Sequence, residues 1–345
     1  MPTTYAIPKG NQYFDATLWT GNGTGARAIS GVNFQPDMVW LKTRSTAYYH
    51  QVHDSVRGAS AGALYTNSTN AQDSSYPITS FNTDGFTLGN SAALIADSFA
   101  SQNYNGTTMV SWEWKGGGTA VTNTAGSITS SVSANTTSGF SVVTWTGVGG
   151  TGTVGHGLSA APKMIMAFPR SFVSDKYVYS ASIGAANYFS TNLTDGSAST
   201  TLWNSTSPTT SVFTVNGNGV NQNTSTYVAY CWAEIAGYSK FGSYVGNGSS
   251  DGPFVYCGFR PKYVIRKGTA AGTDWVVMDS VRSPYNAANA GLYPNLSIAE
   301  NTGPILDILS NGFKVRATGT DENINGNTYI YMAFAENPTK YANAR

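Results

Sequence analysis

The histidines and carboxylates are the residues of this chain with the widest chemical range. Its three histidines are His50, His53 and His156. The segment His-Gln-Val-His-Asp at 50–54 has the residue types of a metal site or a charge-relay pair. On a strand, however, side chains three residues apart point to opposite faces of the sheet. We therefore predict surface or half-buried strand histidines here, and no metal site.

A pair of carboxyl groups is the minimum equipment for glycoside hydrolysis. Asp321 and Glu322 are adjacent on a predicted loop. Three further glutamates end predicted strands: Glu113, Glu234 and Glu336. The last two follow similar dipeptides, Trp-Ala and Phe-Ala, which indicates a structural edge rather than a catalytic pair. We predict no catalytic residues and a non-enzymatic protein.

Glycine-rich segments give no nucleotide-binding signal. Gly-Val-Gly-Gly-Thr-Gly at 147–152 matches the letters of G-x-G-x-x-G. That fingerprint functions only where a strand turns into a helix, and Thr-Val-Gly-His-Gly at 153–157 is a poor helix start. We predict a glycine-rich turn and no cofactor. No P-loop, H-E-x-x-H motif or EF-hand loop occurs in the sequence either.

The composition excludes several classes of protein. The chain has 345 residues, of which 41% are hydrophobic and 11% are charged. With 19 basic and 18 acidic residues the net charge is +1, so the basic face that displaces counterions from nucleic acid is missing. The apolar content is too high for an intrinsically disordered chain. Ser, Thr, Asn and Gly supply most of the polarity.

Membrane insertion and a disulfide framework are not expected. No apolar run approaches the length of about 18 residues that a membrane helix needs. Residues 1–9 lack the charged start and apolar stretch of a signal peptide. Cys231 and Cys257 are too few for a disulfide framework or a four-ligand zinc site. They either pair once or remain small buried thiols, and we expect the thiols.

Five sequence landmarks recur in order along the chain, which predicts an internal repeat. Trp-Thr-Gly-Asn-Gly at 19–23 returns as Trp-Thr-Gly-Val-Gly at 145–149 and Tyr-Val-Gly-Asn-Gly at 244–248, and a proline follows each aromatic by 17 residues. The other landmarks are Asp-Ser-Val-Arg at 54–57 and 279–282, the segments 84–88, 211–215 and 311–315, and the closing segments 109–114, 227–232 and 329–334. We predict three modules, at 1–118, 119–237 and 238–345.

Each module has the pattern of β-structure. Segments 38–42 and 163–168 are nearly continuous apolar runs, typical of strands buried on both faces. Gly-Asn, Asn-Gly and Asp-Gly steps supply turns with positive φ. The best helical candidate, at 91–100, is short. We predict an all-β fold of three tandem β-sandwich modules, jelly-roll or lectin-like, around a pseudo-threefold axis or in a compact row.

The repeated Asp-Ser-Val-Arg has two interpretations. Arg57 and Arg282 are candidates to bind a partner carboxylate or a sugar acid. Alternatively, Asp54 with Arg57 and Asp279 with Arg282 tie a turn at the end of a strand. Because the motif occurs in two modules, we favour the structural interpretation.

Tyrosines in polar, loop-like stretches are candidate contacts, because tyrosine among Ser, Asn and Gly is typical of recognition surfaces. The alternative, of equal weight for each residue, is that they cover the edges of the sandwiches. These tyrosines are Tyr48, Tyr49, Tyr65, Tyr76, Tyr104, Tyr188, Tyr285 and Tyr293.

One long stretch carries a family resemblance. It runs from Gly-Val-Asn-Phe-Gln-Pro-Asp-Met-Val-Trp-Leu-Lys-Thr-Arg at 31–44 through Asp-Ser-Val-Arg-Gly at 54–58 to Ser-Phe-Asn-Thr-Asp-Gly-Phe-Thr-Leu-Gly at 80–89. With the closing segments 333–338 and 341–345, it resembles a repeat domain of unknown function found in virion and tail proteins of tailed bacteriophages. The resemblance covers nearly the whole chain and implies no catalytic residues. The middle module departs from it, since it lacks Asp-Ser-Val-Arg.

The resemblance implies a non-enzymatic structural protein at the surface of a bacteriophage virion. We expect a tail fibre or tail-associated protein that contributes to host attachment. The alternatives are a capsid decoration or head-fibre protein that binds the capsid lattice, and a carbohydrate-binding module. Expected partners are other tail or capsid proteins and a host-surface glycan or protein, with homo-oligomers open. The expected location is the virion, assembled in the host cytoplasm.

Overall fold

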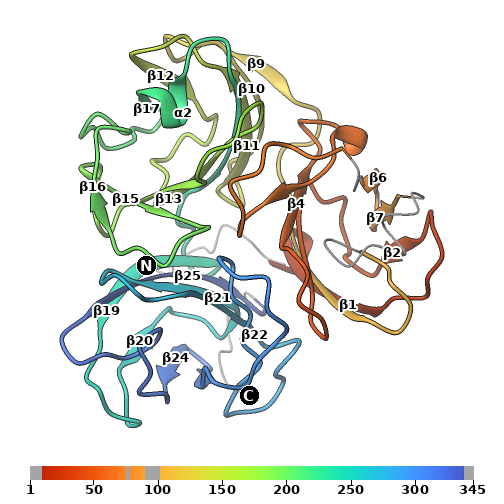
Figure 1. Ribbon diagram of the computed structural model, residues 1–345, viewed down its shortest axis with the longest axis vertical. Coiled ribbons are helices and arrows are strands. Elements are labelled where there is room, and N and C mark those ends of the chain that lie inside the picture. Colours follow the sequence, from red (N-terminus) through yellow and green to blue (C-terminus); the bar gives the residue numbers. More distant parts are fainter. Residues whose placement is uncertain (1–9, 75–77, 90–101, 338–345) are drawn as a thin grey trace, which may run out of the picture.

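The computed structural model describes residues 10–74, 78–89 and 102–337. These residues form an all-β structure of antiparallel sheets. Figure 1 shows three lobes around a common centre, coloured from red to orange, from yellow to green and from cyan to blue. We call them lobe 1 (residues 10–118), lobe 2 (119–237) and lobe 3 (238–337). The predicted helix at 91–100 lies outside the described residues.

The described residues of lobe 1 form two sheets and two 3₁₀ turns. Its strands are β1 (Phe14–Thr20), β2 (Ala28–Ser30), β3 (Met38–Thr43), β4 (Gln51–Asp54), β5 (Leu64–Tyr65), β6 (Ile78–Asn82), β7 (Gly85–Leu88) and β8 (Thr108–Trp114). The 3₁₀ turns are η1 (Gly10–Gln12) and η2 (Ala59–Ala61). The strands form a main sheet in the order β1-β8-β3-β4-β5 and a smaller sheet in the order β2-β7-β6.

Lobe 2 has the longest sheet in the described part of the chain. Its elements are β9 (Val121–Asn123), β10 (Ser130–Asn135), β11 (Phe140–Thr146), β12 (Thr151–Gly155), β13 (Met164–Pro169), β14 (Tyr177–Ser180), β15 (Asn187–Ser190), β16 (Ala198–Ser199), β17 (Val212–Asn216), the one-turn helix α2 (Asn218–Asn221) and β18 (Thr226–Trp232). The main sheet has the order β16-β15-β14-β13-β18-β11-β10-β9, and β12 pairs with β17.

Lobe 3 divides its strands between a main sheet and a smaller one. Its strands are β19 (Ser239–Val245), β20 (Phe254–Tyr256), β21 (Pro261–Gly268), β22 (Trp275–Asp279), β23 (Leu306–Leu309), β24 (Gly312–Val315) and β25 (Thr328–Ala335). The sheet orders are β19-β25-β21-β22 and β20-β24-β23.

The three main sheets contain the same run of four strands. These runs are β1-β8-β3-β4, β11-β18-β13-β14 and β19-β25-β21-β22. The pairing register is also the same, since Trp114 pairs with Met38 as Trp232 pairs with Met164. In each run the last strand of the lobe, β8, β18 or β25, lies between two strands from the first half of the lobe.

Both faces of these last strands are buried, but against different cores. On β18, Val228, Tyr230 and Trp232 point into a core shared by all three lobes. The alternate residues Tyr227 and Cys231 point into a core of lobe 2 alone. This alternation follows from the two-residue period of a strand. It explains the nearly continuous apolar runs, and β3 and β13, fully buried along their length, confirm the prediction of strands covered on both faces.

Aromatic rings from all three lobes meet in the shared core. The ring of Trp114 lies 5.8 Å from that of Trp232 and 5.7 Å from that of Phe334, measured between centroids. Phe14 stacks on Phe334 at 4.9 Å. Each lobe therefore buries part of its main sheet only against the other two lobes.

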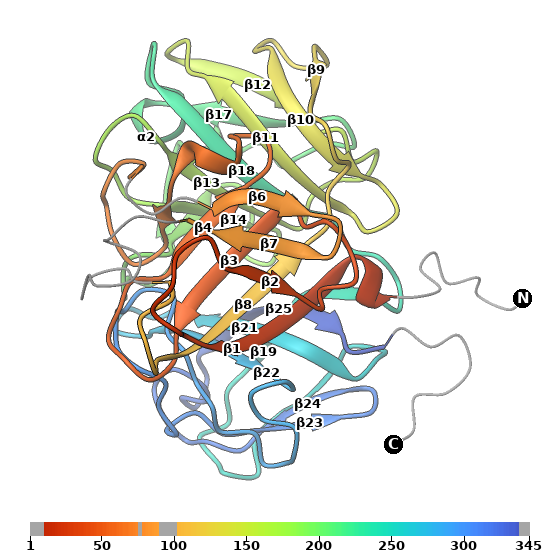
Figure 2. The same ribbon diagram turned by 90° about the vertical axis from the view of Figure 1, so that its right-hand side faces the viewer.

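Each lobe also has a core of its own beneath a smaller sheet. In lobe 1, Ile29 on β2 and Phe86 on β7 pack with Val39 and Met109 of the main sheet. Figure 2 shows β2, β6 and β7 in front of β3, β4 and β8. The small sheet thus has one covered face and one face turned outward.

Burial settles the prediction made for the two cysteines. Cys231 and Cys257 are free and buried, as expected, and burial raises the pKa of both thiols. Within the described residues, no helix has the length and apolar character that crossing a bilayer would need.

Candidate functional site

The Asp-Ser-Val-Arg motif of lobe 1 ties a turn at the end of β4. The Arg57 backbone N–H donates to Asp54 Oδ1 at 2.8 Å, and Arg57 Nε donates to Asp54 Oδ2 at 2.5 Å. Arg57 Nη2 donates to the carbonyl of Val52 at 2.9 Å. The side chains of Arg57 and Asp54 are both 0% exposed. Arg57 is therefore not available to a partner, and the structural interpretation holds.

The motif of lobe 3 repeats this geometry. The Arg282 backbone N–H donates to Asp279 Oδ1 at 2.8 Å, and its Nε donates to Asp279 Oδ2 at 2.6 Å. Its Nη1 also donates to Glu300 at 3.0 Å, and Glu300 accepts from Arg44 of lobe 1. Arg282 is likewise buried and internally paired, so it is no surface contact.

Each motif aspartate also accepts a hydrogen bond from a neighbouring lobe. The Tyr230 hydroxyl of lobe 2 donates to Asp54 Oδ2 at 2.8 Å, and the Trp112 indole of lobe 1 donates to Asp279 Oδ2 at 3.0 Å. We call these two contacts the carboxylate corners. Tyr230 and Trp112 occupy matching positions on β18 and β8, so the two corners are built alike.

The candidate tyrosines differ in exposure, and three of them are buried. Buried are Tyr48, Tyr65 and Tyr293; half-buried are Tyr49 and Tyr188; exposed are Tyr104 and Tyr285; Tyr76 lies outside the described residues. Tyr65 shows the reason. Its hydroxyl donates to Asp73, and the adjacent Thr66 donates to the carbonyl of Pro294 in lobe 3. A neighbouring lobe covers what the local sequence presents as a polar loop.

The histidines are more deeply buried than predicted. Trp40 Nε1 donates to His50 Nδ1 at 3.1 Å, and the Gln102 amide lies 3.2 Å from His53 Nε2. Burial lowers the pKa of His50 well below its ordinary value and that of His53 to about 3, so both rings are neutral. Among the residues that the structure describes, no group of three or more His, Cys, Asp or Glu side chains is placed to hold a metal ion.

The three glutamates at strand ends lie in different environments. Glu234 pairs with Lys240 at 2.8 Å and Glu336 with Arg260 at 2.6 Å, both as edge contacts. Glu113 is different, because it is completely buried on β8 and accepts a hydrogen bond from the Ser111 hydroxyl. Burial raises its pKa to about 8.

Sequence reasoning missed an asparagine clamp on the glycine loop of each lobe. The Oδ1 atoms of Asn103, Asn221 and Asn323 accept the backbone N–H of Asn22, Val148 and Asn247, at 3.3, 3.1 and 2.8 Å. All three clamp residues are buried. The shared pattern Asn-x-Asn at 103–105, 221–223 and 323–325 is a signal that could have revealed them.

The aromatic residue of each glycine loop completes the clamp. Trp19 and Trp145 donate their indole N–H to the carbonyls of Gln102 and Val220 at 3.3 Å. Tyr244 donates its hydroxyl to the carbonyl of Glu322 at 2.8 Å. The predicted glycine-rich turn is confirmed at 147–150, with positive φ at Gly149 and Gly150, whereas 151–152 begin β12.

Two buried lysines that the sequence analysis overlooked join neighbouring lobes. Lys42 Nζ donates to the carbonyl of Ser297 in lobe 3 at 3.1 Å. Lys176 Nζ donates to the carbonyl of Asn70 in lobe 1 at 2.9 Å. Burial lowers the pKa of Lys42 to about 7 and of Lys176 to about 8. Backbone carbonyls receive both ammonium groups, so the lysines serve the assembly of the lobes.

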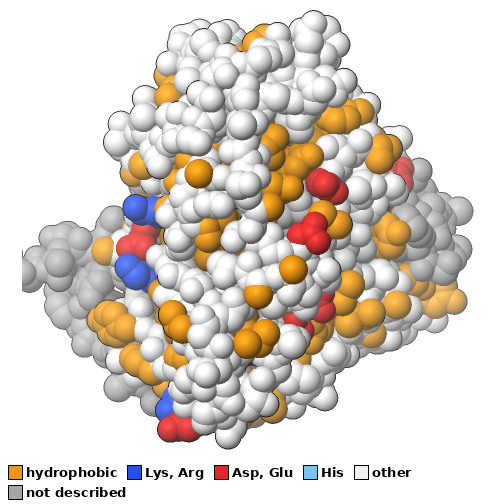
Figure 3. Space-filling view, turned by 60° about the vertical axis from the view of Figure 1, so that its left-hand side comes forward, with side chains coloured by type: hydrophobic (Ala, Val, Ile, Leu, Met, Phe, Trp, Pro, Cys, Tyr) orange, Lys and Arg blue, Asp and Glu red, His pale blue; other side chains and the backbone are white. Residues whose placement is uncertain are grey.

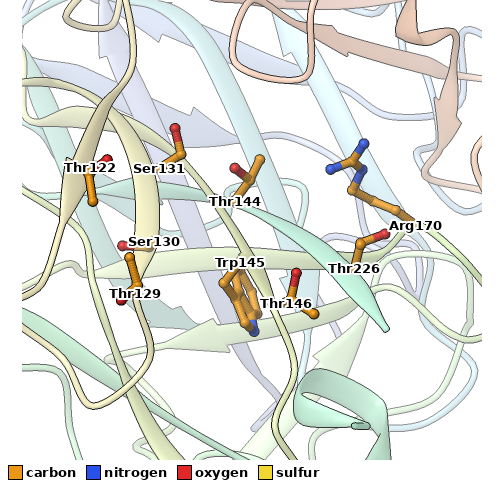
Figure 4. A pocket seen from close by; sticks show the side chains of 9 residues that line it. All are labelled: Thr122, Thr129, Ser130, Ser131, Thr144, Trp145, Thr146, Arg170 and Thr226. Atoms are coloured by element: carbon orange, nitrogen blue, oxygen red, sulfur yellow. The ribbon is translucent and has the colours of Figure 1, made fainter. Parts of the chain in front are cut away.

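A concave pocket on lobe 2 is lined mainly by hydroxyl groups. Its volume is about 310 Å³ (Figure 4). The lining residues are Thr122, Thr129, Ser130, Ser131, Thr144, Trp145, Thr146, Arg170 and Thr226. Trp145 is buried and turned toward Val220, so its ring offers no stacking surface. Arg170 is the one charged lining residue, which leaves the pocket without a carboxylate or imidazole for acid–base chemistry.

A second pocket, of about 420 Å³, opens on lobe 3 beside Arg316, Asp321 and Glu322. Beneath it Arg266 is 1% exposed, and its Nη2 lies 3.6 Å from Glu322 Oε1. No nitrogen of the Arg266 guanidinium has a hydrogen-bond partner among the described residues. By strand register Arg266 corresponds to the apolar Leu41 and Ala167 of the other main sheets, so this buried cation is specific to lobe 3.

Few charged side chains lie on one face of the molecule. Figure 3 shows a face that is mostly uncharged polar groups and backbone, with scattered hydrophobic patches and a few basic and acidic side chains. Such a surface suits recognition by shape and hydrogen bonding more than electrostatic steering.

Comparison with known proteins identifies a family without an assigned activity. No curated protein and no solved structure matches the chain. A family model described as a domain of unknown function, DUF7483, matches residues 9–338, which cover all three lobes as one domain. The chain therefore belongs to the DUF7483 family.

Proposed function

We propose that this protein is a non-enzymatic structural component of a bacteriophage virion surface, a tail fibre or tail-associated protein that contributes to host attachment. It consists, in this proposal, of three β-sandwich modules of jelly-roll or lectin-like type around a pseudo-threefold axis. The common strand order, the shared aromatic core and the three asparagine clamps support this arrangement.

The clamped loops are the observation that carries the proposal. In each lobe the glycine loop and the Asn-x-Asn segment that clamps it are joined by buried hydrogen bonds, and one of the two nevertheless presents an apolar side chain to solvent. These side chains are Tyr104 at 42% and Ile324 at 36% exposure in the Asn-x-Asn segments of lobes 1 and 3, and Val148 at 57% in the glycine loop of lobe 2. Rigid loops on a β scaffold bind partners with little loss of conformational entropy. Three such loops suit a protein that works through surface contacts.

Quantitative mass spectrometry of purified virions, with the major capsid protein as reference, tests the proposal. A few to a few tens of copies, with antibody label on the tail in negative stain, is the expected result. Purified protein should also reduce phage adsorption to host cells, and Tyr104→Ser should weaken this competition. Absence of the chain from virions, or label on the head alone, would overturn it.

A capsid decoration or head-fibre role is the second candidate. The three like lobes favour it, because a pseudo-threefold chain matches a threefold position on a lattice. A copy number in the hundreds per virion would support this role and exclude the tail.

A further inference from the structure

The outward face of β20 differs from its counterparts in the other two lobes. β20 is an edge strand of the small sheet in lobe 3. Val255 points into the core of the lobe, whereas Phe254 and Tyr256 point outward and are 47% and 64% exposed. Residues two apart on a strand stand on one face about 7 Å apart. The two rings therefore form an aromatic strip on the surface.

The strip is absent from lobes 1 and 2. Phe254 pairs with Lys314 on β24, as Ala28 pairs with Thr87 on β7 and Thr153 with Thr214 on β17. By the same register Tyr256 corresponds to Ser30 and Gly155. Two exposed aromatic residues thus occupy positions that are small or polar in the other lobes. Phe254 and Tyr256 are not part of the core of lobe 3, whereas Val255 and Phe313 are.

Opposite Tyr256 the sheet has no side chain. Its partner on β24 is Gly312, where an added Cβ would lie 2.0 Å from the carbonyl oxygen of Val255. Only glycine fits there, so no side chain of β24 stands opposite Tyr256.

Beside Phe254 lies a network of paired charges. Lys314 pairs with Asp251 at 2.6 Å, and Arg316 pairs with Asp307 at 2.6 Å and with Asp251 at 3.4 Å. Two cations and two anions cancel, yet they present several donors and acceptors. The side chain of Asp251 is 79% exposed.

The same network borders the pocket of lobe 3. Arg316 lines that pocket together with Ser250, Tyr293, Asp321 and Glu322. Glu322, one of the lining residues, pairs with the buried Arg266, whose guanidinium nitrogens have no hydrogen-bond partner among the described residues. Hydrogen-bonding groups therefore extend from the strip to the pocket of lobe 3.

We propose that the β20 strip and the adjoining pocket bind a neutral oligosaccharide. Pyranose rings offer C–H faces that stack on aromatic rings and hydroxyl groups that pair with carboxylates and guanidinium groups. The balanced charge of the network fits an uncharged, polyhydroxylated ligand better than an anionic or cationic one. A protein partner is disfavoured, because two rings fall far below the roughly 800 Å² that each side of a stable interface buries. The inference rests on the proposed function and names its receptor class.

A glycan array of neutral and acidic oligosaccharides, probed with the full chain, tests the proposal. We expect capture by at least one neutral oligosaccharide, with affinity then measured by calorimetry. Phe254→Ala and Tyr256→Ala should each weaken that affinity about tenfold, which corresponds to about 1.4 kcal/mol. Val173→Ala, which truncates a 69% exposed side chain of lobe 2, is the control and should leave it unchanged.

Three results would overturn the inference: an array without neutral ligands, binding to acidic glycans alone that salt abolishes, or affinity that Tyr256→Ala leaves intact in a folded protein. The mass-spectrometric count is an independent measurement. A virion protein with a silent array disproves the glycan site and leaves the attachment role. Glycan binding by a protein absent from virions disproves the role and leaves the site.

Discussion

The two carboxylate corners and the matching region between lobes 2 and 3 occupy equivalent places in the fold but are built from different residues. At the corners, Asp54 and Asp279 are buried with an arginine and an aromatic donor. On β14 the matching residue is Ser180, which pairs with Met164 as Asp54 pairs with Met38.

The rest of the set changes together with the aspartate. Three residues after Ser180 stands Ile183, at the position of Arg57, and it packs against the shared core. On β25 the position of Tyr230 and Trp112 is taken by Met332, also in that core. The aspartate, the arginine and the aromatic donor are thus replaced by Ser180, Ile183 and Met332. The difference teaches that a carboxylate is retained in this core only with its complete set of partners, because a buried charge without them is costly.

Breaking a carboxylate corner should have the largest effect on stability. Asp54→Asn leaves the Arg57 guanidinium buried without its counter-charge, and we expect a loss of about 3–5 kcal/mol in the free energy of unfolding. Urea unfolding followed by tryptophan fluorescence measures it. Asp279→Asn is the parallel variant and should behave alike. A loss below about 1 kcal/mol in both would contradict this account of the corners.

Installing an aspartate where the set is missing is the converse experiment. Ser180→Asp buries a carboxyl group beside apolar residues, and we expect a loss of about 3 kcal/mol that becomes smaller at acidic pH, where the group is protonated. Adding Ile183→Arg and Met332→Tyr should recover part of the loss. Ser180→Ala, the control, should cost less than about 1 kcal/mol. Equal stability of the Asp and Ala variants at pH 8 would argue against the comparison.

The hydrogen-bond donor from the neighbouring lobe should contribute less to stability than the aspartate does. Tyr230→Phe removes one hydroxyl and keeps the ring, and a hydrogen bond to a charged group is worth about 1.5–3 kcal/mol. Met332→Leu alters the matching position in lobe 3 without touching a polar contact and should cost less than about 1.5 kcal/mol. The denaturant midpoints of the two variants, measured side by side, show which substitution costs more stability. Indistinguishable midpoints would show that Asp54 does not depend on Tyr230.

A third comparison concerns the face of the last strands that points into the core of a single lobe. On this face Glu113 of β8 occupies the position of Cys231 on β18 and Ala333 on β25. Because burial raises the pKa of Glu113 to about 8, the folded state keeps the proton between about pH 4.5 and 8 and the unfolded state releases it. This group therefore makes stability fall as pH rises through that window, by at most about 1.4 kcal/mol per pH unit. Glu113→Gln should flatten the profile measured by urea unfolding from pH 5 to 8. An unchanged slope would assign the dependence to other groups.

Local patterns predicted the elements well where the cause is local. The positive-φ turn at Gly149 and Gly150 follows from the glycine-rich segment, and the tie between Asp54 and Arg57 follows from a motif four residues long. The apolar run of β13 correctly indicated burial on both faces. For the turn and the tie the partners lie within a few residues, so the sequence contains the whole interaction.

Candidate contacts were predicted less well, because their exposure depends on distant segments. Tyr65 and Tyr293 lie in polar stretches of sequence but are buried, and Tyr293 belongs to the core of lobe 3. Phe254 and Tyr256 went unnoticed, although they alternate with Val255 in the pattern of a half-buried strand. The pairing with β24, about 60 residues further on, decides which of the three residues faces outward.

The sequence by itself determined the all-β class, the strands buried on both faces, the glycine turns and the recurrence of five landmarks, because these depend on composition and on spacing within short segments. Tertiary structure alone decided that the main sheets share one aromatic core, that two aspartates accept hydrogen bonds from other lobes, and that His50, Glu113 and Arg266 are buried. Burial and partner choice arise from contacts between residues as far apart as Trp112 and Asp279, and no local pattern encodes them. The aromatic strip on β20 became visible only when the fold showed which face of that strand the core leaves free.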